Sequence, residues 1–121
     1  MVTWPYTPVR EESNLDWRKL SEHESRQLKR SYIDGHLETI KRADFVLIAN
    51  YPKNGIEGYI GANALMEAAF AYALGVPVAY LQPVGAQPCQ LEALALSEYV
   101  IGDDLNVVQA ILAKQTSSND T

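Results

Sequence analysis

Two nearly continuous apolar segments, separated by an apolar helical segment, constrain the fold of this chain most. Residues 44–50 (DFVLIAN) and 77–81 (PVAYL) have the length and composition of strands that are covered on both faces. Between them, residues 62–74 have the composition of a strong helix, and Gly75 follows where a left-handed C-terminal residue is needed. Strands that alternate with helices predict an α/β fold with a mainly parallel sheet and helices on both faces.

The flanking segments extend this pattern in both directions. Residues 2–6 (VTWPY) predict a short strand or an extended entry. Ser21 and Glu24 have the spacing of a capping box, and the helix that they open is expected to reach about Arg42. Further elements are expected as a loop or short helix at 10–20, a turn-rich connection at 83–88, a helix at 90–96, a short strand at 99–101 and a helix at 105–113.

Length and charge narrow the classes of protein to which the chain can belong. The 121 residues fit one domain, which we place at 1–113, followed by a polar, frayed tail at 114–121. The formal net charge is −5 and there is no basic stripe, so binding to polymeric nucleic acid is not expected. A small anion can still bind at a helix N-terminus without many cations.

The remaining composition predicts a cytoplasmic protein without cofactor or metal. Cys89 is the single cysteine, so no internal disulfide can form, and it has no partner that would make it a nucleophile or a metal ligand. His23 and His36 are too few and too far apart for a zinc site. No apolar stretch is long enough to span a membrane, and residues 1–10 lack the hydrophobic core of a signal peptide.

One carboxylate stands out in the central helix. Only Asn63 and Glu67 are strongly polar in residues 62–74, and their spacing of four places them on one helix face. A charge in such an apolar helix is costly unless it is exposed, paired or functional. Glu67 is expected to point back toward the turn at residues 58–61 (GYIG), where two glycines allow close approach by a ligand.

A structural explanation competes with this functional one. Asn63 and Glu67 can equally form the solvent-facing stripe of a surface helix. The loop before the helix favours function, because Tyr51 and Tyr59 offer flat surfaces of the kind that stack on a nucleobase or pack on a sugar. Tyrosines in loops are also common packing residues.

Residues 36–83 resemble the nucleoside 2-deoxyribosyltransferase-like superfamily, including its nucleotide N-glycosidase relatives. The resemblance rests on HLETIKRADFVLIAN (36–50), on GYIGANALMEAAFAYALGVPV (58–78) and on the proline-containing loop that follows. It implies a flavodoxin-like, three-layer α/β/α domain in which Glu67 attacks the anomeric carbon of a ribosyl or deoxyribosyl group. The base leaves, a glycosyl–enzyme ester forms, and water or another base resolves it, as in a retaining glycosidase. An ionised Glu67 suits this role, whereas a neutral one would be a poor nucleophile.

The chain departs from the family pattern at two places. Its opening residues 2–5 resemble the second strand of the family, so the first strand and helix are expected to be missing. The chain would then be a fragment truncated at the N-terminus, a reorganised domain, or a domain that a partner completes. Accessory acidic positions of the transferases correspond to His36 and Gly61 here, so catalysis does not follow from the resemblance alone.

Several polar residues are candidates to assist Glu67. His36 can protonate a departing base, although a lone histidine beside an apolar face is more often a packing residue. Asn63 can bond a sugar hydroxyl or orient Glu67, and Asn50 ends the central strand at the same edge of the sheet. Asp44 begins that strand at the opposite edge, where structural capping is expected. The predicted site contains Glu67 and His36 as catalytic residues and Asn50, Gly58, Tyr59, Gly61 and Asn63 as substrate-binding residues.

Three functions remain open on the sequence. The first is an enzyme that cleaves or transfers at the N-glycosidic bond of a nucleoside or a nucleoside 5′-monophosphate. The second is a binding module of the same fold that lacks turnover, and the third is a structural oligomerisation domain. A homodimer or larger homo-oligomer is expected under the first two, because a small domain with an incomplete sheet exposes apolar edges.

Overall fold

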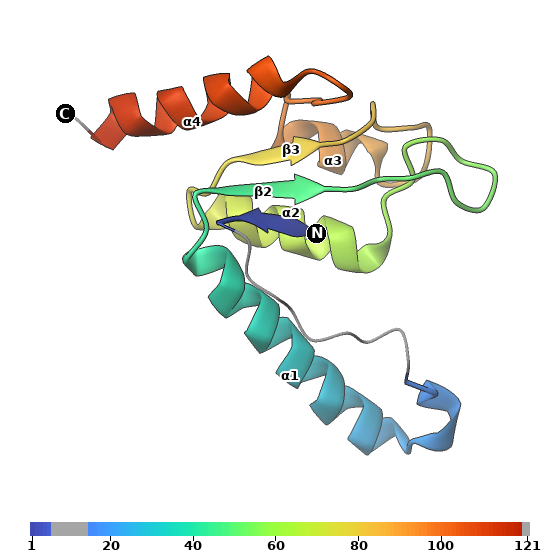
Figure 1. Ribbon diagram of the computed structural model, residues 1–121. Helices are drawn as coiled ribbons and strands as arrows, with labels where there is room; N and C mark the ends of the chain where they lie inside the picture. Colours follow the sequence, from blue (N-terminus) through green and yellow to red (C-terminus); the bar gives the residue numbers. More distant parts are fainter. Residues whose placement is uncertain (6–14, 120–121) are drawn as a thin grey trace.

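The computed structural model describes residues 1–5 and 15–119, which form a small three-stranded sheet with helices on both of its faces (Figure 1). The protein is therefore α/β, as the alternation of apolar segments predicts. The elements in chain order are β1 (Val2–Trp4), the 3₁₀ helix η1 (Trp17–Lys19), α1 (Glu22–Lys41), β2 (Phe45–Ile48), α2 (Ala62–Ala73), β3 (Val78–Tyr80), α3 (Gln90–Leu96) and α4 (Leu105–Asn119).

The sheet is mixed, which corrects the expectation of a mainly parallel one. Its order is β1-β2-β3, and β2 pairs with β3 in parallel while β1 pairs with β2 antiparallel. The strand expected at 99–101 is only a single bridge between Tyr80 and Val100. The side-chain pattern of a three-residue strand such as β1 does not reveal whether it runs parallel or antiparallel to its neighbour. The path of the chain decides this, because α1 ends at Lys41 and the N–H of Asp44, just before β2, then donates to the carbonyl oxygen of Trp4 at the end of β1.

The residues of β2 alternate between two apolar clusters. Val46 and Ile48 belong to the larger cluster, which the residues of α2 and α3 complete. Phe45 packs with Ile111 of α4 on the other face of the sheet. Figure 1 shows α4 on one side of the sheet and α2 on the other. The strand is covered on both faces, which explains why its sequence is continuously apolar.

The helix ends largely follow the sequence signals. Ser21 and Glu24 form the capping box that opens α1, and Asp104 accepts a hydrogen bond from the N–H of Asn106 at the start of α4. Gly75 has φ +73 after α2. The prediction that the chain frays from residue 114 is wrong for residues 114–119, because α4 continues to Asn119. No glycine or proline interrupts residues 105–119, so a polar composition alone does not end the helix.

Tyr80 connects β3 to α3 and makes the fold sensitive to alkaline pH. Its hydroxyl is buried and donates a 2.6 Å hydrogen bond to the carbonyl oxygen of Ala93. Burial, with a smaller contribution from the charge of Cys89, raises the pKa of Tyr80 to about 12. A raised pKa stabilises the fold fully below about pH 10, the unfolded value, and this stabilisation is lost as pH rises toward 12.

We predict that Tyr80→Phe removes this alkaline sensitivity. At pH 8 the wild type is expected to be the more stable protein by about 1–2 kcal/mol, because the variant leaves the buried Ala93 carbonyl without its donor. Between pH 9 and 11.5 the advantage should shrink by about 2 kcal/mol. Urea unfolding of both proteins at pH 9 and pH 11.5 measures the difference in their free energies of unfolding. A difference that does not change with pH would contradict the raised pKa of Tyr80.

Among the described residues, no helix is long and apolar enough to cross a membrane.

Candidate functional site

Glu67 is buried within the fold. It lies in the second turn of α2 and is only 4% exposed, and it is the only charged residue among the buried residues of the described chain. The solvent-stripe explanation of Asn63 and Glu67 is therefore wrong for Glu67. Burial of a carboxylate without compensation is costly, so the groups around Glu67 decide what it can do.

The contacts of Glu67 come from α1 and from the residue before β1. Oε1 lies 3.5 Å from Nδ1 of His36, and Oε2 lies 3.8 Å from the amino nitrogen of Met1. Oε2 and Nε2 of His36 are buried without a hydrogen-bond partner. The structure thus brings both predicted catalytic residues, Glu67 and His36, together. It orients the carboxylate toward α1 and β1 rather than toward the turn at 58–61.

Asn63 extends this contact between α1 and α2 by one helical turn. Its Oδ1 accepts a 2.8 Å hydrogen bond from Nζ of Lys29, seven residues before His36 on α1. Residues spaced by four on α2 therefore meet residues spaced by seven on α1, as expected for two helices in side-by-side contact.

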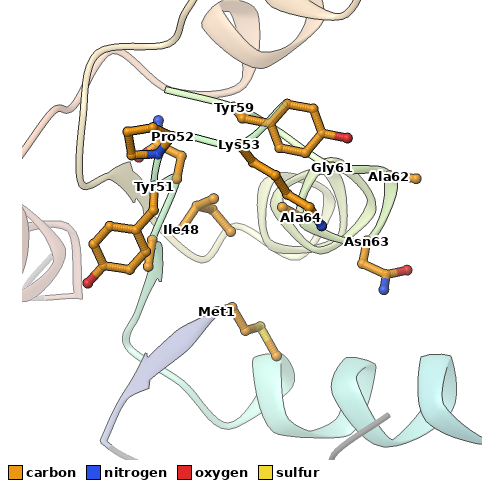
Figure 2. Close-up of a pocket in the computed structure, with 12 residues that line it drawn as sticks. Met1, Ile48, Tyr51, Pro52, Lys53, Tyr59, Gly61, Ala62, Asn63 and Ala64 are labelled. Atoms are coloured by element: carbon orange, nitrogen blue, oxygen red, sulfur yellow. The ribbon is translucent and has the colours of Figure 1, made fainter. Parts of the chain in front are cut away.

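A pocket of about 530 Å³ opens between the end of β2 and the start of α2 (Figure 2). In Figure 2, Lys53 and Tyr59 lie over the start of α2, while Tyr51 and Pro52 lie on the opposite side. Four of the predicted substrate-binding residues line it: Asn50, Tyr59, Gly61 and Asn63. The full lining is Met1, Ile48, Ala49, Asn50, Tyr51, Pro52, Lys53, Tyr59, Gly61, Ala62, Asn63 and Ala64.

Glu67 is not a lining residue of this pocket, but Met1 both lines the pocket and contacts Glu67. The side chain of Met1 is 1% exposed and packs against the larger apolar cluster. The pocket and the buried carboxylate are therefore neighbouring regions with Met1 between them.

Asn50 has a structural role that limits what it can bind. Its Nδ2 donates to the carbonyl oxygen of Gln82, and its Oδ1 accepts from the N–H of Gln82, both at 2.8 Å. The amide thus fastens the loop after β2 to the loop after β3. Asn50 lies at the pocket as predicted, and its two bonds to Gln82 use one donor and one acceptor position of the amide to shape the wall.

The close approach of another segment of the chain requires glycine at position 58. Gly58 has φ +64, and a Cβ at this position would lie 1.9 Å from the carbonyl oxygen of Pro83. Gly85 faces it, and its own Cβ would lie 1.8 Å from the carbonyl oxygen of Glu57. The N–H of Gly85 donates to the carbonyl of Gly58 at 3.1 Å. Gly58 lies outside the main pocket and lines a second hollow of about 420 Å³ beside Pro83.

Gln87 secures this crossing and was not anticipated from the sequence. Its Nε2 donates to the carbonyl oxygens of Gly58 and Gly85 at 2.9 and 3.0 Å, and its Oε1 accepts from the N–H of Ile60 at 2.8 Å. A glutamine in a proline-rich loop has no pattern that reveals such contacts. The crossing holds the segment that leads into α2, and it therefore positions the pocket.

Positive groups lie at the wall of the pocket, although the whole chain has a formal net charge of −5. Gly61 caps α2 without a side-chain hydrogen bond, so the first N–H groups of the helix lie at the pocket wall. Nζ of Lys53 lies 5.9 Å from the centre of the Tyr59 ring at the same wall. Sequence reasoning also missed Lys53 and Met1 as lining residues, since neither stands in a recognisable motif.

No group of three or more His, Cys, Asp or Glu side chains that could hold a metal ion occurs in the described part of the chain. The described residues of the site comprise a buried carboxylate, an imidazole and a neighbouring pocket lined by tyrosine, lysine and the first residues of α2.

Comparisons of the chain with models of protein families, with curated proteins and with solved structures gave no match.

Proposed function

We propose that this protein cleaves or transfers at the N-glycosidic bond of a nucleoside or a nucleoside 5′-monophosphate, with Glu67 as the nucleophile. The observation that carries the proposal is a buried glutamate next to a pocket of about 530 Å³ that has tyrosines in its wall. The resemblance of residues 36–83 to the nucleoside 2-deoxyribosyltransferase-like superfamily supports the same assignment.

The proposed reaction has two displacement steps. A carboxylate oxygen of Glu67 bonds to C1′ of the sugar, and the C1′–N bond breaks with its electron pair passing to the base, which takes up a proton. Water, or a second base, then attacks C1′ and releases the carboxylate, with retention of configuration. Hydrolysis yields free base together with the free sugar, or with the sugar 5-phosphate when the substrate is a nucleotide, whereas transfer yields a new nucleoside or nucleotide. The flat side chains of Tyr51 and Tyr59 supply surfaces on which a base can stack.

His36 has a positioning role in this proposal. Its Nδ1 lies 3.5 Å from Oε1 of Glu67, whereas His36 is not a lining residue of the pocket. From this position His36 can orient the carboxylate through the contact between Nδ1 and Oε1, so we assign it to the nucleophile. The expectation that His36 protonates the base is thereby replaced by an effect on the nucleophile.

A non-catalytic nucleotide-binding module is the second candidate. It is favoured by the separation between Glu67 and the pocket, because a ligand can occupy the pocket without reaching the carboxylate. The two candidates share the pocket and differ only in whether bond cleavage follows binding.

The finer architecture and the assembly state belong to the same proposal. We infer a flavodoxin-like variant of the α/β class from the parallel β2–α2–β3 unit with helices on both sheet faces. A homodimer or larger homo-oligomer would cover exposed apolar side chains such as Trp4, Tyr72 and Leu91. A nucleoside or nucleotide is the small-molecule partner.

The test is a panel of ribo- and deoxyribonucleosides and their 5′-monophosphates incubated with the purified protein. Free base is measured by chromatography, and binding of each compound is measured by calorimetry. We expect at least one compound to release its base. Binding without release over long incubation would favour the binding module, and neither binding nor release by any compound would refute both candidates.

A further inference from the structure

We propose that Met1, carried by β1, is a gate that covers Glu67 and must move aside before the carboxylate can reach a ligand in the pocket. Glu67 is buried, and Met1 is a lining residue of the pocket whose amino nitrogen lies 3.8 Å from Oε2 of Glu67. The carboxylate is thus closed off from the pocket by a residue that belongs to the edge of the sheet.

The strand that carries this gate is weakly held. β1 has three residues, pairs with β2 along one edge, and places Val2 and Trp4 at the surface, with Trp4 57% exposed. Short elements with few buried apolar contacts open at low free energy compared with the core. Release of β1 would leave the parallel β2–β3 pair and both apolar clusters around it in place.

Buried polar atoms at the contact lack hydrogen bonds in the closed state, in which the amino nitrogen of Met1 faces Oε2 of Glu67 at 3.8 Å. In the described part of the chain, three buried side-chain polar atoms have no hydrogen-bond partner: Oγ1 of Thr3, Nε2 of His36 and Oε2 of Glu67. They come from β1, α1 and α2, the elements that meet at the gate. A buried polar atom without a hydrogen-bond partner destabilises the state in which it is buried. Opening β1 exposes these atoms to water or to the hydroxyl groups of a ligand, which offsets the loss of strand contacts.

The register of the sheet identifies a pair of residues at which β1 can be cross-linked to β2 on the face of the sheet away from Glu67. Val2 and Leu47 are directly opposed across the antiparallel pair. Leu47 packs against the apolar cluster on the α4 face, whereas Val46 and Ile48 belong to the cluster on the α2 face. A disulfide between positions 2 and 47 would therefore hold Met1 close to its observed position, because consecutive Cα atoms are only about 3.8 Å apart.

The experiment compares the oxidised double variant Val2→Cys/Leu47→Cys with the two single variants, all in a Cys89→Ser background. Each protein is treated with a water-soluble carbodiimide and glycinamide, and labelling of carboxylates is measured by peptide mass spectrometry. We expect Glu67 to be labelled in the single variants and protected at least tenfold in the locked protein. Glu92, exposed on α3, should label equally in all of them.

This labelling result does not depend on the proposed reaction. Equal labelling of Glu67 with and without the lock would overturn the gate, and so would complete protection of Glu67 in the unlocked single variants. The second readout, release of base from a substrate of the panel, rests on the proposed function. We expect the lock to lower turnover at least tenfold and a reducing agent to restore it. Absence of turnover in every form, with Glu67 protected only when locked, would refute the enzyme and leave the gate standing.

Discussion

Glu67→Gln is expected to abolish base release while leaving binding of the nucleotide largely intact. Glutamine keeps the shape of the side chain but cannot form the glycosyl ester, so turnover should fall by at least about 10³-fold. Binding should change little, because Glu67 does not line the pocket. Steady-state base release and calorimetric titration with the best substrate of the panel measure the two effects separately.

A matched control for this variant is Glu38→Gln. Glu38 is an exposed residue of α1 that pairs with Lys41, so its neutralisation changes net charge by the same amount at a distance from the pocket. Its turnover should equal that of the wild type. A Glu67→Gln protein that retained more than about a tenth of the wild-type rate would exclude Glu67 as the nucleophile. Loss of binding together with turnover would instead indicate that the variant has lost the pocket.

Gly58→Ala is expected to be the most destabilising single methyl addition at a loop glycine of the site. The new Cβ would lie 1.9 Å from the carbonyl oxygen of Pro83, so the two crossing loops would have to separate. Steric overlap of this kind costs about 1–3 kcal/mol, and the left-handed backbone at φ +64 adds about 1–2 kcal/mol for an L-residue. We therefore expect a loss of about 2–5 kcal/mol in the free energy of unfolding, measured by urea denaturation.

Gly55→Ala separates the two contributions. Gly55 has φ +75 in the same loop, but nothing lies within 4 Å of the position that its Cβ would take. This variant should lose only the backbone cost, about 1–2 kcal/mol. If both variants lose equal stability, the crossing with Pro83 contributes nothing measurable. If Gly58→Ala also abolishes nucleotide binding while still folded, the crossing is what positions the start of α2.

The helix carrying Glu67 shows how far local pattern can predict a site. The isolation of Glu67 in an apolar helix singled it out as unusual, and it is indeed the buried charged residue of the described chain. The partner of that carboxylate could not be read in the same way. His36 lies 31 positions away on another helix, and the two meet only because α1 packs against α2.

Gly58 shows the opposite case. Two glycines beside a tyrosine have the same local appearance whether a ligand or another loop approaches the backbone. In the structure, the backbone atoms of Pro83 and Gly85 occupy the space beside Gly58 that a side chain would need, although both residues lie more than twenty positions further along the chain. The amide of Asn50 is likewise taken up by Gln82. Contacts between distant loops leave no periodicity in the sequence, so these structural roles could not be predicted from it.

The α/β class, the positions of the main helices, the buried strands β2 and β3, and the unusual carboxylate of Glu67 could all be predicted from the amino-acid sequence. These features follow from periodicity, capping residues and continuous apolar segments, which are properties of neighbouring residues. The antiparallel direction of β1, the contact of His36 with Glu67 and the contact of Met1 with both Glu67 and the pocket became visible only in three dimensions. Those outcomes depend on how short elements dock at long sequence separation, where the free energy comes from packing rather than from local preference.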